Sequence, residues 1–263
     1  MATPIVQVDA FTAEPFGGNP AGVCILPRER DEAWMQHVAR EMNVAETAFV
    51  IPQSRGFGLR WFTPTVEMEL CGHATLAAAH ALWEGGHLPR TEQARFQTKS
   101  GLLTADLRGD WIEMDFPSTP AAEVEPPAKL LESLRAPAKH VAKSRFDYLV
   151  ELESEQAVRS LDPDLRGFAH LPARGVIVTS RAATPEFDFV SRFFAPAAGV
   201  DEDPVTGSTH SCLAPFWGGR LSKSKMTARQ VSSRGGVLKL ELAGDRVLIS
   251  GQAVTVMRAE ILA

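Results

Sequence analysis

The sequence predicts an α+β protein made of two similar lobes. A short motif occurs twice, because residues 60–64 (RWFTP) and 192–196 (RFFAP) both read Arg-aromatic-Phe-small-Pro. Acidic residues, a glycine and the start of an apolar stretch follow each copy, and the proline-rich residues 117–128 separate the halves. Internal repetition of this kind indicates a duplicated fold. We therefore expect one polar strand-to-helix turn from each lobe to face a shared cleft, a preferred place for small ligands.

The composition is typical of a soluble globular protein. The 263 residues suffice for one large domain or two ordinary ones, and 44% hydrophobic and 22% charged residues are average values. A net charge of -5, with scattered Lys and Arg, argues against nucleic-acid binding. No apolar run reaches the length of a membrane span, and the first residues lack a signal-type core. We expect a cytoplasmic protein with no nucleic-acid or membrane partner.

No pattern in the sequence indicates a metal or a nucleotide cofactor. The chain has an odd number of cysteines, and no two of them lie close together in the sequence: they are Cys24, Cys71 and Cys212. This argues against a disulfide scaffold or a zinc site. His73 and His80 fall on one predicted helix without a third ligand at a useful spacing. Glycine-rich phosphate-binding motifs are absent. We therefore expect neither a metal nor a cofactor.

The first half opens with two strands around a glycine turn. Residues 5–11 are β-branched and nearly alternating, residues 16–20 (FGGNP) form a turn, and residues 21–26 are a second apolar strand. Asp31 then caps a helix. The apolar residues of this helix form one stripe: Trp34, Met35, Val38, Ala39 and Met42.

A central helix is predicted between two groups of strands in the first half. Strands at 47–51 and 58–62 precede it, and Pro64 stops the second of them. Residues 73–83 are rich in alanine, so other backbone can approach closely, and the helix should be buried. Three strands follow it: 94–98, 102–107 and 111–116.

The second half repeats this arrangement less clearly. A short helix is expected around residues 130–134, followed by three strands at 148–152, 176–179 and 187–194. A helix begins near Ser208, and Pro215 should limit or kink it. The remaining strands are 237–242, 246–250 and 254–261.

Glu46 is the first candidate for chemistry. It stands between a predicted helix and a predicted strand, among small or apolar neighbours. A carboxylate in such a segment is either a capping or paired group, or a catalytic acid/base. The sequence alone leaves both interpretations open.

The two repeated turns carry the other candidates. Gly72 and Gly207 each precede a helix, whose N-terminal N–H groups favour an anion. His73 then either caps its helix or donates to a substrate and carries a proton. Asp203 lies in an acidic loop before Gly207, and such loops are usually only solvated. The first turn also carries acids, which favours a function for Asp203.

A two-thiol racemase would need one cysteine at equivalent places in each lobe. Cys71 directly precedes Gly72, but Thr206 precedes Gly207, so the thiols are not symmetric. Cys71 can still line the site. Cys24 and Cys212 are expected to be small core residues.

Together these segments resemble the PhzF-like (phenazine-biosynthesis-type) isomerase family, which is related in fold to diaminopimelate epimerase. The resemblance runs from near the start to the last quarter of the chain. The matching segments are residues 9–11, 18–23, 41–47, 60–64, 71–75 and 199–208. It implies two lobes, each a β-barrel-like mixed sheet wrapped around a central helix, with the active site between them. The lobes would be residues 1–116, with 254–263 packing back on them, and residues 117–253.

The resemblance also implies cofactor-independent acid/base chemistry. The family's proton-shuttle glutamate falls on Glu46, its histidine on His73 and its aspartate on Asp203. Residues implied to bind the substrate are Asn19, Cys71, Gly72, Gly207 and Ser208. The best-understood branch moves a proton around the ring of a dihydro-hydroxyanthranilate, but those enzymes carry no cysteine before the first glycine.

The expected function is that of an isomerase or epimerase acting on a small amino- or hydroxy-carboxylic acid, because reaction class transfers better than substrate. Two alternatives remain open. One is a non-catalytic or regulatory protein that keeps the cleft to bind a ligand or partner. The other is a racemase assisted by Cys71. A homodimer is compatible with the sequence.

Overall fold

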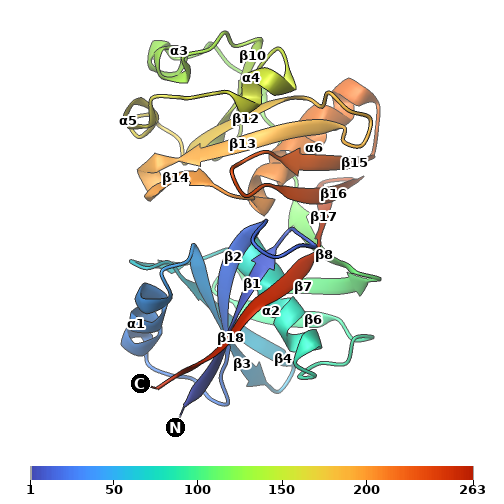
Figure 1. The fold of residues 1–263 in the computed structure, drawn as a ribbon. Coiled ribbons are helices and arrows are strands. Elements are labelled where there is room, and N and C mark those ends of the chain that lie inside the picture. Colours follow the sequence, from blue (N-terminus) through green and yellow to red (C-terminus); the bar gives the residue numbers. More distant parts are fainter. Residues whose placement is uncertain (1, 263) are drawn as a thin grey trace. The chain divides into compact units, whose positions relative to one another are not determined.

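The computed structural model describes residues 2–262, which fall into two compact units. Unit 1 comprises Met1–Asp115 and Ser250–Ala263, and unit 2 comprises Phe116–Ile249. The chain leaves unit 1 within strand β8 (Trp111–Pro117) and returns within strand β17 (Arg246–Gly251) (Figure 1). No helix among the described residues is long and apolar enough to cross a membrane.

Unit 1 is a sheet of mixed direction with two helices. Its helices are α1 (Glu32–Met42) and α2 (Gly72–Glu84). Its other strands are β1 (Thr3–Ala10), β2 (Asn19–Ile25), β3 (Glu46–Gln53), β4 (Gly56–Phe62), β5 (Glu67–Met68), β6 (Ala94–Thr98), β7 (Gly101–Arg108) and β18 (Ala253–Ile261). Helix α1 begins as expected, because the side chain of Asp31 accepts a hydrogen bond from the backbone N–H of Trp34 at 2.8 Å.

Unit 2 has the same kind of sheet with more short helices. Its helices are α3 (Ala128–Leu134), α4 (Glu155–Arg159), α5 (Leu165–Phe168) and α6 (Gly207–Leu221), with a 3₁₀ turn at Pro196–Ala198. Its strands are β9 (Ala122–Glu123), β10 (His140–Lys143), β11 (Asp147–Glu151), β12 (Gly175–Arg181), β13 (Phe189–Ala195), β14 (Val200–Asp203), β15 (Lys225–Gln230) and β16 (Gly236–Ala243), besides β17. Strands β9, β10, β14 and β15 and helices α4 and α5 were not predicted from the sequence.

The strand pairings of the two units follow the same order. In unit 1, β2 and β3 are parallel, β4 is antiparallel to β3, and β6 returns parallel to β4 after α2. In unit 2, β11 and β12 are parallel, β13 is antiparallel to β12, and β15 returns parallel to β13 after α6. The sequence repeat is therefore a repeat of topology. The predicted fold class, α+β with sheets curved around a central helix, is confirmed.

The repeated arginine and acid of the motif form the same bidentate pair in both units. Arg60 donates to both carboxylate oxygens of Glu67, at 2.7 and 2.8 Å, and so joins β4 to β5. Arg192 donates to both oxygens of Glu202, at 2.7 and 2.9 Å, and joins β13 to β14. These repeated acids hold each short strand in place.

The repeated aromatic residue supports each of these arginines. The guanidinium of Arg60 lies 5.2 Å from the ring centre of Phe62, and that of Arg192 lies 4.8 Å from the ring centre of Phe194. Both distances fall in the range of cation–π contacts. The motif as a whole is thus a structural element that was duplicated with the fold.

Both central helices, α2 and α6, are buried. Their sequences make this possible in different ways. Helix α2 packs on β1, β2, β3 and β18, and its alanines let these strands approach. Pro215 was predicted to limit or kink helix α6; the helix continues through it, so the limit is wrong and the kink stays a prediction. Proline cannot donate to the carbonyl four residues earlier. That carbonyl, on Ser211, instead accepts from the backbone N–H of Thr119 at 3.0 Å.

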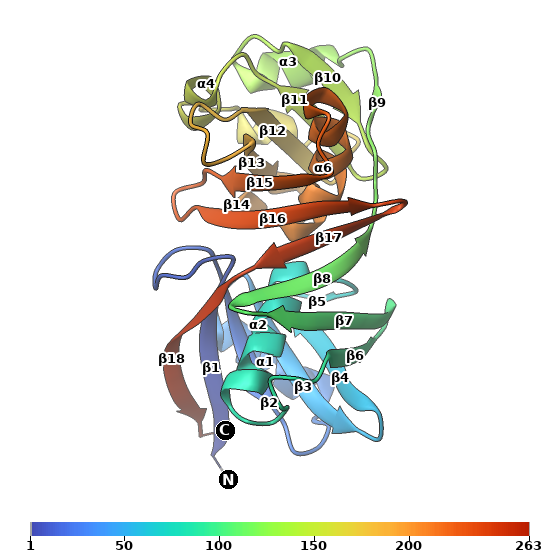
Figure 2. The ribbon, with the colours of Figure 1, turned by 90° about the vertical axis from the view of Figure 1, so that its right-hand side faces the viewer.

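The last strand, β18, pairs antiparallel with β1 from Thr3 opposite Ile261 to Ala10 opposite Ala253. Figure 2 shows the two strands side by side. In unit 2, β10 pairs with β11 and also with β9, which supplies only two residues to the pairing. The end of the chain therefore completes the sheet of unit 1.

Candidate functional site

Three predicted site residues of unit 1 meet where two parallel strands begin. Asn19 opens β2 and Glu46 opens β3, and the register sets Ala21 opposite Glu46. Parallel neighbours start at the same edge of a sheet. Helix α2, which packs on both strands, starts at Gly72 and so brings His73 to that edge.

The imidazole of His73 is the centre of this group. Its Nε2 lies 3.0 Å from Oε2 of Glu46, although the ring N–H is not aimed well enough for a hydrogen bond. Its Nδ1 lies 3.3 Å from the side-chain nitrogen of Asn19, which can donate to it. The His73 side chain is 7% exposed and that of Glu46 is 15% exposed. Glu46 therefore keeps some access to a ligand while its histidine partner is nearly enclosed.

Cys71 approaches the other side of the same ring. It occupies the N-cap position of α2, and its Sγ lies 3.6 Å from Nδ1 of His73. Burial raises the pKa of the Cys71 thiol, and the nearby Glu46 carboxylate adds to the effect. The thiol is therefore protonated near neutral pH and is suited to donate a proton, not to attack as a thiolate.

The pKa of His73 is raised well above its usual value. Burial lowers this pKa, but the electrostatic interactions of the ring with Cys71 and Glu46 outweigh burial. The pair can therefore hold a proton on the ring nitrogen that faces the carboxylate.

A metal ion held by all three side chains does not fit this geometry. Ligand atoms of Glu46, Cys71 and His73 do lie within 4.8 Å of one another. However, Glu46 faces Nε2 while Cys71 faces Nδ1, so the two approach different ring nitrogens. Zinc bonds of about 2.0–2.3 Å could not join all three groups without rearrangement.

In unit 2, Asp203 is the last residue of β14, and the end of β15 holds the segment after it in place. Its carboxylate accepts a hydrogen bond from the hydroxyl of Thr206. The buried side chain of Gln230 donates to the Asp203 carbonyl at 2.8 Å and accepts from the Thr206 N–H at 3.0 Å. The Ser232 hydroxyl donates to the Pro204 carbonyl at 2.7 Å. Gln230 was missed from the sequence, because β15 itself was not recognised.

Ser208, in the first turn of α6, contacts a residue that was also missed. Arg174 donates from Nη1 to the Ser208 hydroxyl at 3.0 Å. The same guanidinium donates to both oxygens of Asp147, from Nε at 2.9 Å and from Nη2 at 2.5 Å. Asp147 is only 2% exposed. Neither residue lies in a motif, and their only sequence signal is that each stands next to the start of a predicted strand.

Both helix starts lack a capping side chain. Cys71 and Thr206 occupy the N-cap positions of α2 and α6 without a side-chain hydrogen bond to the helix, within the described residues. The first N–H groups of a helix have no partner inside it. Gly72 and Gly207 thus keep the backbone open where an anion is favoured. The expectation that the two starts face one cleft stays a prediction.

His210 of helix α6 and the cysteines Cys24 and Cys212 belong to the core. His210 is fully buried, and its Nδ1 lies 2.8 Å from the Thr206 carbonyl. Burial lowers the pKa of His210 to about 4, so the ring is neutral. Burial raises the pKa of Cys24 and of Cys212 to about 12, in keeping with small core residues.

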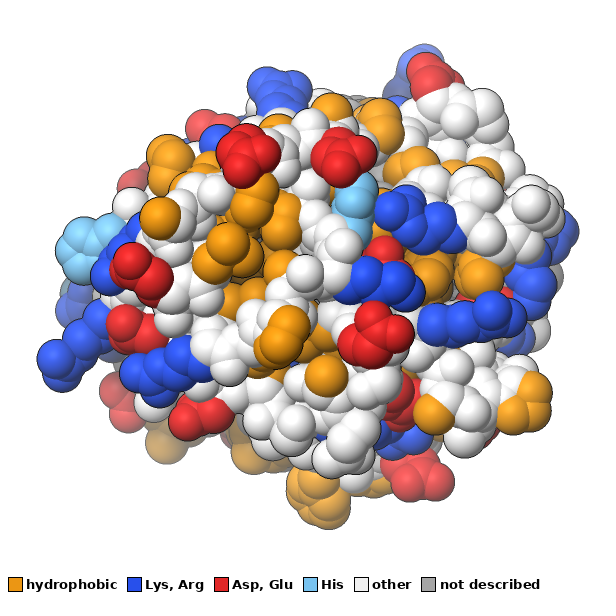
Figure 3. Space-filling model, turned by 90° about the horizontal axis from the view of Figure 1, so that it is seen from above, with side chains coloured by type: hydrophobic (Ala, Val, Ile, Leu, Met, Phe, Trp, Pro, Cys, Tyr) orange, Lys and Arg blue, Asp and Glu red, His pale blue; other side chains and the backbone are white. Residues whose placement is uncertain are grey.

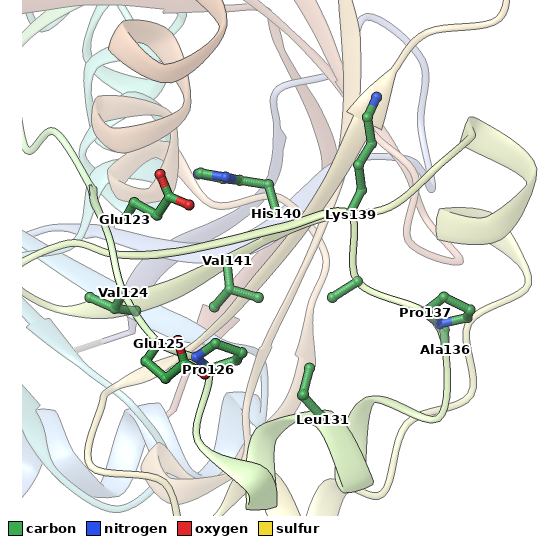
Figure 4. A pocket seen from close by; sticks show the side chains of 11 residues that line it. Glu123, Val124, Glu125, Pro126, Leu131, Ala136, Pro137, Lys139, His140 and Val141 are labelled. Carbon is green, nitrogen blue, oxygen red and sulfur yellow. The ribbon is translucent and has the colours of Figure 1, made fainter.

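Two surface pockets of the described residues lie away from these side chains. One pocket of about 450 Å³ in unit 2 lies among β9, α3 and β10, where Leu131, Pro137 and Val141 line it (Figure 4). Another of about 270 Å³ in unit 1 is lined by His80 and Arg90. The face drawn in Figure 3 mixes acidic and basic side chains, so it offers no continuous basic surface for nucleic acid.

Comparisons with known proteins agree over the whole chain. Residues 8–259 match the family described as "Phenazine biosynthesis-like protein". An uncharacterized isomerase of Halalkalibacterium halodurans is 54% identical over 263 residues, which cover 100% of this chain and 99% of that protein.

Solved structures support the same assignment. The crystal structure of a PhzF-family phenazine biosynthesis protein from Enterococcus faecalis matches with a TM-score of 0.96 and 38% identity, covering 100% of both chains. A hydroxyproline epimerase from Agrobacterium vitis, with bound trans-4-hydroxy-L-proline, matches with a TM-score of 0.64 and 11% identity, covering 99% of this chain and 92% of that one. The latter likeness shows the fold alone. The chain belongs to the phenazine biosynthesis-like protein family.

Proposed function

We propose that this isomerase moves a proton on a small amino- or hydroxy-carboxylic acid by acid/base catalysis, with Glu46 as the base. The observation that carries the proposal is the pairing of a partly exposed carboxylate with an enclosed imidazole, 3.0 Å apart. A carboxylate needs such access to reach a substrate C–H. The name "isomerase" of the 54% identical relative supports the same reaction class.

The proposed step balances without an added reactant. Glu46 takes the proton from a carbon next to an electron-withdrawing group, and the electron pair of the C–H bond spreads into that group. The proton then returns from Glu46 to another carbon of the same π-system, which makes the isomer. Before the first step and after the second, the proton on His73 stabilises the negative charge of the Glu46 carboxylate, which lies 3.0 Å away.

We assign substrate binding to the two helix starts and their loops. Asn19, Gly72 and Cys71 accompany Glu46 and His73 in unit 1. From unit 2 we include Gly207 and Ser208, with Asp203 as a second polar group for the substrate. A carboxylate at a helix start gains about 0.3–1 kcal/mol when exposed and up to about 2 kcal/mol when partly buried.

The test is incorporation of deuterium from D₂O into a panel of small amino- and hydroxy-carboxylic acids, read by mass spectrometry. Glu46→Gln keeps the shape of the side chain but cannot exchange a proton. Its exchange rate should fall by about 10²–10⁴-fold, whereas Glu41→Gln on the exposed face of α1 should leave the rate unchanged.

Two results would contradict the proposal. A folded Glu46→Gln protein with wild-type exchange would make Glu46 a structural group, and its melting temperature would then be expected to drop. Absence of exchange with every acid, while carboxylates still bind, would favour the non-catalytic alternative.

A second candidate is a racemase assisted by Cys71. The supporting observation is the 3.6 Å contact between the Cys71 thiol and His73, which links Cys71 to Glu46 through one imidazole. A racemase would invert one centre, whereas the first proposal moves the proton to a different carbon. Chiral chromatography of the product, with Cys71→Ala beside the wild type, separates the two. The absence of an equivalent thiol at Thr206 favours the first.

A further inference from the structure

Topology makes the starts of α2 and α6 equivalent, yet different side chains face them. Gly72 and His73 open α2, and Gly207 and Ser208 open α6. Strands β3 and β12 are equivalent too, because each is parallel to the strand before it and antiparallel to the strand after it. At the start of β3 stands Glu46, which faces His73. Directly before β12 stands Arg174, which contacts Ser208.

The guanidinium of Arg174 is held on several sides. Two of its nitrogens donate to the buried Asp147, as described above, and these bonds fix the plane of the group. Its central carbon lies 5.1 Å from the ring centre of Phe193 and 5.7 Å from that of Phe146. The remaining nitrogen, Nη1, is therefore aimed at the Ser208 oxygen by its surroundings.

The contact with Arg174 determines whether the Ser208 hydroxyl donates or accepts a further hydrogen bond. A hydroxyl both donates and accepts hydrogen bonds, whereas a guanidinium only donates. Once Arg174 occupies a lone pair of the Ser208 oxygen, the hydroxyl proton is directed to another acceptor. The N–H groups in the first turn of α6 are donors as well. Such a set of donors complements a group that only accepts, and an ionised carboxylate is such a group.

We propose that Arg174 is a positioning residue that acts through Ser208 and makes the start of α6 specific for the carboxylate of the substrate. The inference rests on the proposed function, which requires a carboxylic acid as substrate. The inference assigns different tasks to the residues at the start of α2 and at the start of α6. Glu46 and His73 handle the proton, and Arg174 and Ser208 orient a donor towards the carboxylate.

The test measures binding of 2-aminobenzoate and its uncharged analogue 2-aminobenzamide by isothermal titration calorimetry. Arg174→Met alone would leave Asp147 buried without its partner, so the variant is Asp147→Asn with Arg174→Met. Ser208→Ala is the second variant, and all three changes together make the third. Urea midpoints of each variant report whether it is folded.

We expect the wild type to prefer the carboxylate over the amide by about tenfold or more, the value of one hydrogen bond to a charged group. Each variant should lower carboxylate affinity by about the same factor and leave amide affinity nearly unchanged. The triple variant should lose no more than Ser208→Ala, because residues that act through one another are not additive.

Three outcomes would overturn the inference: equal wild-type affinity for the two probes, unchanged carboxylate affinity in the Asp147/Arg174 variant, or losses that multiply in the triple variant. Failure of the proposed function is seen separately. A carboxylate preference with no proton exchange would leave Arg174 in its role and remove Glu46 from its own.

Discussion

Protonation of His210 should limit the stability of the protein in acid. The ring is fully buried, and its Nε2 has no hydrogen-bond partner among the described residues. Its pKa is lowered to about 4 by burial, although the Thr206 carbonyl opposes this. In the unfolded chain the pKa returns to about 6.5. Below that pH the unfolded state binds more protons than the folded state, so the free energy of unfolding decreases as the pH falls towards 4.

The size of the effect follows from the shift. A fall from 6.5 to about 4 corresponds to at most about 3 kcal/mol, at about 1.36 kcal/mol per unit. Between pH 7 and pH 4.5 the loss is about 2 kcal/mol. His73 titrates with the opposite sign, since a raised pKa adds stability that is present below about 6.5 and lost as the pH rises through the folded-state value. Its contribution is common to the wild type and to any variant at position 210.

His210→Asn is the informative change. The asparagine amide can still donate to the Thr206 carbonyl but does not titrate. Urea unfolding at pH 7 and at pH 4.5 should show a smaller acid loss in the variant, by about 2 kcal/mol. His37→Gln, at an exposed position on α1, is the matched control and should keep the wild-type loss. The same acid loss in His210→Asn and wild type would refute the reasoning, because His210 would then protonate in the folded state without cost.

Two further substitutions test whether the hydrogen bonds around the candidate site stabilise the fold. The free energy of unfolding is measured with urea at pH 7. Gln230→Leu leaves the Thr206 N–H without its acceptor and should cost about 1–3 kcal/mol. Its control, Gln93→Leu, removes a half-buried hydrogen bond between side chains outside the site and should cost less. Arg192→Met removes the bidentate partner of Glu202 and should cost about 3 kcal/mol or somewhat less, since Glu202 is partly exposed. A loss below about 0.5 kcal/mol in either test variant would show that its contacts do not stabilise the fold.

The fold class and the unit 1 part of the candidate site could be predicted from the sequence, because both depend on local patterns. The stripe of α1, the alanines of α2 and the repeated motif are all readable within short windows. Glu46 and His73 were singled out by their neighbours, and the parallel start of β2 and β3 explains why they meet. Strand β15 was missed because its outward positions are polar and its inward ones include Gln230, which weakens the hydrophobic signal.

Residues that act through long-range pairing could not be predicted in the same way. Asp147 and Arg174 are far apart in the sequence, and only the parallel pairing of β11 with β12 brings them together. For the acids of the repeat, the sequence shows the residues but not their partners. Glu67 and Glu202 belong to the same repeated acidic segments as Asp203, but their carboxylates are occupied by arginines. Sequence patterns show where acids recur and not which of them an arginine neutralises.

The two units share one set of structural contacts and differ in the residues at their helix starts. Each unit retains the bidentate arginine–glutamate pair that fixes its short strand, with an aromatic ring beside the arginine. The residues that face the helix starts differ, with a carboxylate and an imidazole in unit 1 and a guanidinium and a hydroxyl in unit 2. A strand start beside an uncapped helix is a place where a side chain can change without disturbing the sheet. That freedom explains how one scaffold, present twice, can supply both a proton-transfer group and a carboxylate-orienting group for the proposed reaction.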